Sequence, residues 1–377
     1  MLRLHIQDAA RTTASAAGRD NNFNLIRAAA ATAVLISHAF PIARGKGTVE
    51  PLEAMLGLKL GTLAVYVFFG ISGFFIAKSF SDRGSDAYYI SSRALRIYPA
   101  YAVVLLFAAL IIGPIFSGDG ILSYLKAHDV REYFLSGLTI KYVKYEIHGV
   151  FENNPYPRAV NGPVWTLYYE AFCYLAVFVA GRCGLLQRRT FPLLVLPYAF
   201  WYLTHRHLIW TPSILGQYAE LTLPFVIGAG LHIYRAPARS LWAPFAIAVL
   251  LYSWALKAGY GREAAAIAGP VGAIWLGFLR IPSLKGYNRL GDYSYGIYLY
   301  GWPLEQAVVA SWPAAEPIQV IAIALPASVL CAVLSWRFVE APALQLRDVS
   351  ANFLGRLFAQ PRLPAGATGE GSGAGVS

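Results

Sequence analysis

The sequence predicts an all-α polytopic membrane protein with about ten transmembrane helices and one longer extracytoplasmic loop. Of the 377 residues, 57% are hydrophobic and 14% are charged, whereas soluble domains carry roughly 25% charged residues. The mean hydropathy is +0.48. Apolar runs of about 20 residues recur along the chain, and a helix of that length spans the hydrocarbon core of a bilayer.

The predicted spans follow one another with short connections, apart from a single long loop. They cover residues 23–42, 59–80, 97–116, 164–181, 190–204, 217–234, 241–257, 263–280, 290–310 and 317–338. Pro192 and Pro197 interrupt the fifth span and Gly269-Pro270 interrupts the eighth, which membrane helices tolerate when they pack against neighbours. The loop at 117–163 has mixed charge and many Pro, Asn and Gly residues, which indicates an ordered loop rather than a separate domain.

Three regions are expected: an N-terminal segment at 1–21, a membrane domain at 22–345 and a tail at 346–377. The first segment lacks the apolar core of a signal peptide, so we expect it to be retained in the cytoplasm. Lys and Arg residues concentrate on the flanks that share a side with the N-terminus, so the positive-inside rule places both termini in the cytoplasm. The tail ends in a Pro/Gly/Ala/Ser-rich stretch and is expected to be largely disordered.

Composition also argues against several classes of function. The net charge of +11 does not indicate nucleic-acid binding, because the basic residues flank apolar segments and form no extended basic face. Cys173, Cys183 and Cys331 show no CxxC spacing, so neither a metal site nor a disulfide framework is predicted. Membrane lipid is the expected surrounding, no permanently bound cofactor is expected, and the oligomeric state is left open.

Arg27 and His38 lie inside the first apolar run, where ionisable side chains are costly and mark function or a paired structural site. They are eleven residues apart, so they share one helix face and lie about 16 Å apart along the axis. Together they place a fixed cation and a proton acceptor with a pKa near 6.5 along one line through the membrane. The structural alternative is a packed histidine and a snorkelling arginine.

Arg93 and Arg96 lie one helical turn apart at the entrance of the third run, and Glu170 lies about two turns inside the fourth. Two guanidinium groups on one face suit a phosphate-bearing ligand, although any two basic residues would also provide positive-inside anchoring. A carboxylate at the depth of Glu170 must be protonated, paired or facing water. It could orient an imidazole, bind a hydroxyl-bearing ligand or pair with a basic residue. In the second run, Gly70 and Gly73 favour close helix packing over passage of a slender ligand.

Six stretches in sequence order resemble the acyltransferase-3 family of integral membrane O-acyltransferases, which acylate exopolysaccharides, lipopolysaccharides and related glycans. They are Asn22-Phe-Asn-Leu-Ile-Arg27 through Ser37-His38, Val67-Phe-Phe-Gly-Ile-Ser-Gly-Phe-Phe75, Arg93-Ala-Leu-Arg-Ile-Tyr-Pro99, Asn161 to Glu170, Leu290 to Tyr300, and Ser335-Trp-Arg-Phe-Val-Glu-Ala-Pro342. The resemblance implies ten membrane helices in a bacterial inner membrane, a cytosolic acyl-CoA donor with acetyl as the default acyl group, and an acceptor on the outer side.

Carried over by position, the resemblance implies that His38 is the catalytic histidine, that Arg27 is a second essential residue, and that Glu170 is the family's carboxylate. Arg93 and Arg96 match the RxxR motif associated with the donor. Two positions depart from many relatives, which have Asp where this chain has Asn24 and His where it has Gly301. If that Asp normally balances Arg27, another group must do so here.

The expected reaction is transfer of the acyl group to a glycan hydroxyl, with His38 as general base, a contribution of about 10²–10⁴-fold. Glu170 is expected to fix the tautomer of His38 or to stabilise its charged form, and a covalent acyl-histidine relay is a second possible course. The alternative from a different class is a multi-span transporter or flippase of a glycan or lipid-linked substrate, in which the same ionisable residues would line a pathway. The acceptor glycan cannot be read from the sequence.

Overall fold

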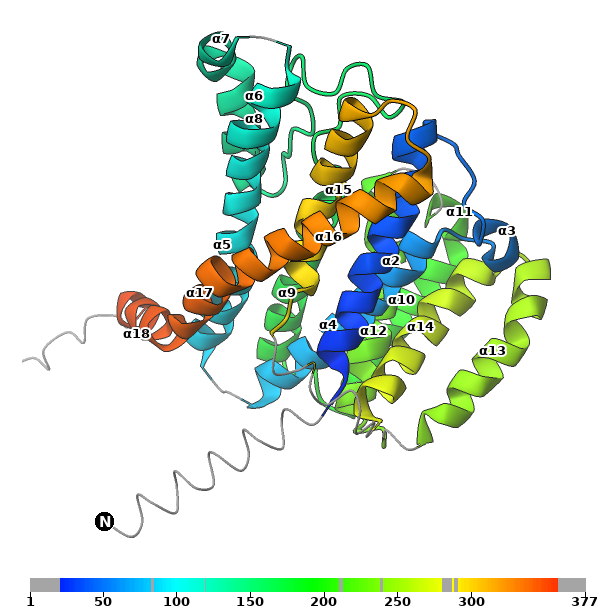
Figure 1. Ribbon diagram of the computed structural model, residues 1–377. Coiled ribbons are helices and arrows are strands. Elements are labelled where there is room, and N and C mark those ends of the chain that lie inside the picture. The colour runs from blue at the N-terminus through cyan, green and yellow to red at the C-terminus, as the bar shows by residue number, and fades with distance from the viewer. Residues whose placement is uncertain are drawn as a thin grey trace, which may run out of the picture.

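The chain folds into a bundle of helices in which the longest elements run roughly side by side (Figure 1). The computed structural model describes residues 21–358 except 83–84, 119, 210–212, 238–239, 280–286 and 288–290. The predicted N-terminal segment at 1–21 therefore lies almost wholly outside the described residues, as does the tail from 359 onward. Within the described ranges the only β-structure is one isolated antiparallel bridge between Glu146 and Ala159. The predicted all-α class is confirmed.

The long helices occur in the predicted order. They are α2 (Phe23–Arg44), α4 (Leu60–Asp82), α5 (Asp86–Phe107), α9 (Trp165–Arg182), α10 (Phe191–Thr204), α12 (Ile214–Ile233), α13 (Trp242–Lys257), α14 (Gly261–Phe278), α15 (Ser294–Ser311) and α16 (Pro317–Ser335). Two of them continue through a π-helical turn: α5 through η1 (Ala108–Ile112) into α6 (Gly113–Phe116), and α16 through η5 (Trp336–Glu340) into α17 (Ala341–Gln345). Each predicted apolar run overlaps one of these helices.

Among the described residues, five helical stretches are long and apolar enough to cross a membrane: α2, α4, α5 with η1 and α6, α12, and α16 with η5 and α17. Helices α10 and α13 are apolar but shorter. On α13 only Ala255 is buried, while Leu250 and Trp254 are exposed. Large apolar side chains on outward faces are typical of a surface that lipid covers. The protein is therefore a helical membrane protein, and the count of ten spans stays a prediction.

Helix α4 lies at the centre of the bundle and packs most closely against α12. A Cβ atom added to Gly73 would lie 2.0 Å from the carbonyl oxygen of Phe225, and one added to Gly228 would lie 1.9 Å from that of Gly70. The two backbones are thus in direct contact, which only glycine permits. The packing interpretation of Gly70 and Gly73 holds.

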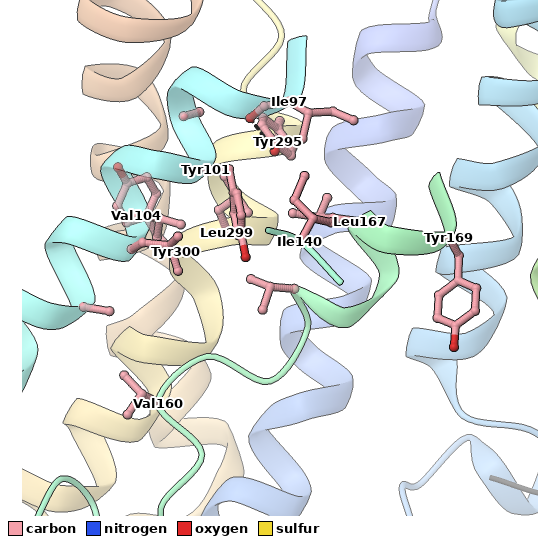
Figure 2. Close-up of a cluster of buried hydrophobic side chains, with 14 of the residues drawn as sticks. Ile97, Tyr101, Val104, Ile140, Val160, Leu167, Tyr169, Tyr295, Leu299 and Tyr300 are labelled. Atoms are coloured by element: carbon pink, nitrogen blue, oxygen red, sulfur yellow. Dashed lines mark hydrogen bonds between the residues drawn. The ribbon is translucent and has the colours of Figure 1, made fainter. Parts of the chain in front are cut away.

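The largest apolar core joins α5, α9 and α15 with the segment before α9. Figure 2 shows Tyr101 and Val104 of α5 facing Leu299 and Tyr300 of α15 within this core. The hydroxyl of Tyr101 donates to the carbonyl of Gly137 at 2.9 Å, so the buried ring brings no unsatisfied polar atom with it. This core fixes the position of α15 relative to α5, and both helices contribute to the site described below.

The predicted long loop is folded. It contains α7 (Ile121–Lys126) and α8 (His128–Leu138), and its later part is tied to α15 because Asn154 donates to the side chain of Gln306 at 2.8 Å. At the other end of the domain, α18 (Arg347–Phe358) packs against α5. An ordered helix therefore begins where the tail is expected to start.

Candidate active site

Two neighbouring cavities lie within the bundle, and together they receive most of the predicted site residues. The arginine cavity, of about 50 Å³, is lined by Arg27, Val65, Phe68, Phe69, Ser72, Arg96, Ile97, Thr166, Leu167, Glu170, Ser294, Tyr295 and Tyr298. The histidine cavity, of about 580 Å³, is lined by His38 and other residues of α2 together with residues of α4, α9, α12, α14, α15 and the connecting loops. Val65, Thr166 and Tyr298 line both.

Both arginines that line the arginine cavity belong to a chain of four alternating charges, Arg27, Asp292, Arg96 and Glu340. Asp292, just before α15, accepts from Arg27 at 2.9 Å and from Arg96 at 2.6 Å through the same carboxylate oxygen. Arg96 also reaches Glu340 of η5 at 3.3 Å. Asp292 is 7% exposed and Glu340 is 2% exposed, and buried charges of this kind persist only when they are paired.

This chain of charges answers the question raised by Asn24. The counter-ion of Arg27 is Asp292, which comes from the far end of the sequence rather than from the same helix. The π-helical turn η5 presents Glu340 to Arg96, and the hydroxyl of Ser335 donates to the other oxygen of that carboxylate at 3.1 Å. π-Helical turns are rare and often lie at functional sites.

Glu170 lines the arginine cavity together with Arg27 and Arg96. Its carboxylate accepts hydrogen bonds from the hydroxyls of Tyr174 and, at 3.5 Å, Ser72. No hydrogen bond joins it to His38 among the described residues, so the contact expected between the two does not form. Glu170 lines the same cavity as Arg27, whereas His38 lies about 16 Å from Arg27 along the axis of α2 and lines the other cavity.

His38 is half-buried in the wall of the histidine cavity, and its ring packs edge-on against Trp302 with centroids 4.9 Å apart. Lys59 lines the same cavity, and its positive charge interacts with the imidazole of His38. The helix turn that carries His38 is held by its neighbour Ser37, whose hydroxyl donates to the buried Glu50. The other oxygen of Glu50 accepts from the backbone N–H of Leu60 at 3.1 Å, which ties α2 to the start of α4.

The stretch from Asn161 to Glu170 forms the wall between the two cavities. Asn161 donates to the carbonyl of Leu299 at 3.0 Å, which fixes the turn against α15. Tyr298 donates to the carbonyl of Pro163 at 2.7 Å, and its hydroxyl lies 2.6 Å from that of Thr166. The two residues of this hydroxyl pair line both cavities.

Arg93 lies outside both linings. Its guanidinium lies 5.7 Å from the ring centroid of Tyr174, and its buried Nε has no hydrogen-bond partner among the described residues. Arg93 and Arg96 therefore differ: the first has no carboxylate partner in that part of the chain, whereas the second is held by two carboxylates.

Comparison with known proteins identifies the family. A family described as an acyltransferase domain matches residues 20–337, which is most of the chain. The chain belongs to the acyltransferase-3 family. The acyltransferase is 27% identical over 311 residues to an O-acetyl transferase of Shigella phage Sf6, covering 77% of this chain and 86% of the relative. It is 28% identical over 371 residues to nodulation protein 10 of Rhizobium leguminosarum bv. viciae, covering 88% and 95% respectively. No solved structure matches it at a significant level.

The protein is therefore a membrane O-acyltransferase, and the transporter alternative is not favoured. The geometry of this acyltransferase brings Arg27, Arg96 and Glu170 to one cavity and places His38 in the next. The pairing of Asp292 with two arginines is not indicated by any local feature of the sequence, although the residue lies in the stretch from Leu290 to Tyr300. The position of Tyr298 in the lining of both cavities is likewise not indicated by its sequence context.

Proposed function

We propose that this acyltransferase moves an acyl group, acetyl by default, from cytosolic acyl-CoA to a hydroxyl of an envelope or secreted glycan. It would act in the bacterial inner membrane with both termini in the cytoplasm. His38 is the general base. The printed activity of the phage relative, an O-acetyl transferase, supports an acetyl group and an oxygen acceptor.

The observation that carries the proposal is the arrangement of two cavities in series. Arg27 and Arg96 line one and His38 lines the other, with Tyr298 common to both. Acyl-CoA is too highly charged to cross lipid, and a polymeric glycan cannot enter the bundle. Two chambers that meet inside the protein let the two substrates approach from opposite sides, which brings the reacting atoms together without moving either substrate across.

The reaction needs one proton acceptor beside the hydroxyl group of the acceptor, in the histidine cavity. In the proposed step, His38 takes the proton of the acceptor hydroxyl as the oxygen attacks the thioester carbonyl carbon. A carbon–oxygen bond forms, the carbon–sulfur bond breaks, and the imidazolium returns the proton to the departing CoA sulfur. The products are an ester and free CoA thiol. The half-buried ring of His38 packs against Trp302, and this contact keeps the imidazole oriented toward the histidine cavity.

The donor end is assigned to the basic residues of α2 and α5. Arg93 is available to a phosphate because no carboxylate holds it among the described residues. Arg96 and Arg27, which Asp292 holds in place, would line the path of the pantetheine arm. For the phosphates themselves, the planar guanidinium fork of Arg93 has a matching geometry. Glu170 lies on the same path, so we assign it to the donor side rather than to His38.

The acceptor end is assigned to the histidine cavity. Its volume of about 580 Å³ accommodates a sugar unit, and Tyr156, Trp165 and Trp302 line it. Aromatic rings provide apolar faces against which sugar rings can pack, and cavities of this size are typical of small-molecule sites.

The proposal is tested by mass spectrometry of base-labile acyl groups on the host's envelope glycans. Strains that express the wild type, no protein, the His38→Ala variant or the His207→Ala variant are compared; His207 is exposed outside the site and serves as a matched control. We expect an ester that is lost in the deletion and His38→Ala strains and retained with His207→Ala, with both variants present in the membrane. If the glycan of the deletion strain were unchanged, the proposed acceptor would be wrong. If the ester were lost in the deletion strain but retained in the His38→Ala strain, His38 would not be the general base.

A further inference from the structure

Helix α18 brings a third arginine to the two of α5. Arg347 is the first residue of α18, and α18 packs along α5. The charge of Arg347 interacts with those of Arg93 and Arg96. Its hydrogen-bond partner is the phenol of Tyr88, and its buried Nε has no partner among the described residues.

This arrangement is unfavourable as it stands. Burial, the largest effect, and the positive charges of Arg93 and Arg96 lower the pKa of Arg347, which lies outside the apolar spans. No carboxylate is paired with Arg347 or Arg93 in the part of the chain that the structure describes. A buried donor without an acceptor costs the full desolvation of that group. Two such donors, the Nε groups of Arg93 and Arg347, belong to side chains whose like charges interact. An anion bound between them would relieve both costs.

We propose that Arg347 and Arg93 form a phosphate-binding pair for the nucleotide portion of the acyl-CoA donor. This assignment rests on the proposed function and extends it to a helix that begins in the predicted tail. Arg96 is excluded from the pair because Asp292 and Glu340 already occupy its guanidinium.

The location favours the nucleotide over a lipid headgroup as the source of phosphate. Arg347 follows directly after η5 and α17, and η5 carries Glu340, the partner of Arg96. Arg96 in turn lines the arginine cavity. A phosphate held at Arg347 and Arg93 thus lies at the entrance to a chain of residues that leads inward to Glu170.

The test is direct binding of CoA to the purified full-length protein in detergent or nanodiscs, measured by calorimetry. The variants are Arg347→Gln, Arg347→Lys and Arg356→Gln; Arg356 is an exposed arginine on the same helix and provides the matched loss of charge. The probes are CoA, dephospho-CoA and pantetheine, which differ in the number of phosphates. Because a hydrogen bond to a charged group contributes about tenfold or more in affinity, we expect Arg347→Gln to weaken CoA binding by about that factor. Arg356→Gln should change it by less than about twofold.

A second readout separates ligand binding from a structural role. Removing Arg347 relieves repulsion in the empty protein, so Arg347→Gln should melt no lower than the wild type without CoA and should gain less on adding CoA. The effect of the substitution should disappear with pantetheine, which carries no phosphate.

Distinct outcomes refute distinct claims. If the wild type binds CoA and Arg347→Gln binds it equally well, the phosphate pair is wrong while the proposed function stands. If the substitution instead reduces only the anionic phospholipid retained in nanodiscs, the ligand is a headgroup and the assignment to CoA fails. If the wild type binds no CoA, the proposed donor is wrong.

Discussion

Replacing Asp292 by asparagine keeps the shape of the side chain and removes the negative charge shared by Arg27 and Arg96. Breaking a buried ion pair by removing one partner costs about 3–5 kcal/mol, since the other charge remains desolvated. Two features place this site near the lower limit. The side chain of Arg27 is 26% exposed, and Arg96 keeps Glu340 at 3.3 Å. We therefore expect a loss of about 3 kcal/mol, equivalent to a fall in melting temperature of about 4 °C for a chain of 377 residues.

The measurement is thermal unfolding of the purified protein in one detergent at one scan rate, since membrane proteins often unfold irreversibly. Asp348→Asn, which removes an exposed carboxylate from α18, is the matched control and should melt like the wild type. In the double variant Asp292→Asn/Arg27→Met, part of the loss should be recovered, with a coupling of about 0.5–3 kcal/mol. If Asp292→Asn melts with the wild type, the chain of charges does not hold these helices together.

Three further changes test other parts of the structure. Gly228→Ala places a carbon 1.9 Å from a carbonyl oxygen of α4, so we expect the free energy of unfolding to fall by about 1–3 kcal/mol and the melting temperature to fall with it. The control is Gly120→Ala, which adds a carbon in open space and should have no effect. Glu170→Gln should reduce turnover but leave the pH dependence of the rate unchanged, because Glu170 lies on the proposed donor side and has no hydrogen bond to His38 among the described residues. A displaced pH profile would contradict this placement. Tyr298→Phe removes the hydroxyl that is hydrogen-bonded to Thr166. If this pair divides the two cavities, the rate of acyl-CoA hydrolysis without acceptor, measured as free thiol, should rise by about 2–10-fold. An unchanged rate would show that the pair does not divide them.

The helical architecture could be predicted because apolar runs of span length are a local property of the sequence. The same holds for Gly70 and Gly73, whose small size predicted close helix packing; the structure shows that the partner is α12. The separation of Arg27 and His38 along one helix, which places them in two different cavities, also followed from their spacing. These features needed no knowledge of which helices are neighbours.

Pairing between distant segments could not be predicted. Asp292 lies in the stretch from Leu290 to Tyr300, which resembles the family. No local feature of that stretch indicates the ion pair with Arg27, because the contact depends on how α2, α5 and α15 pack. The expected contact between Glu170 and His38 failed because Glu170 lines the same cavity as Arg27, about three helical turns from His38 along α2. The relative level of two helices depends on how they pack against each other, and the residues of one span do not indicate it.

The chain of charges also has a consequence for biosynthesis. The hydrogen bonds of Arg96 to Asp292 and Glu340 join residues separated by 196 and 244 positions. During synthesis the first helices must therefore enter the membrane long before their counter-ions leave the ribosome. Charged residues in a bilayer are costly until they are paired. The early helices must accordingly wait near lipid headgroups, water or an insertase, and the bundle can close only when the last third of the chain has been inserted.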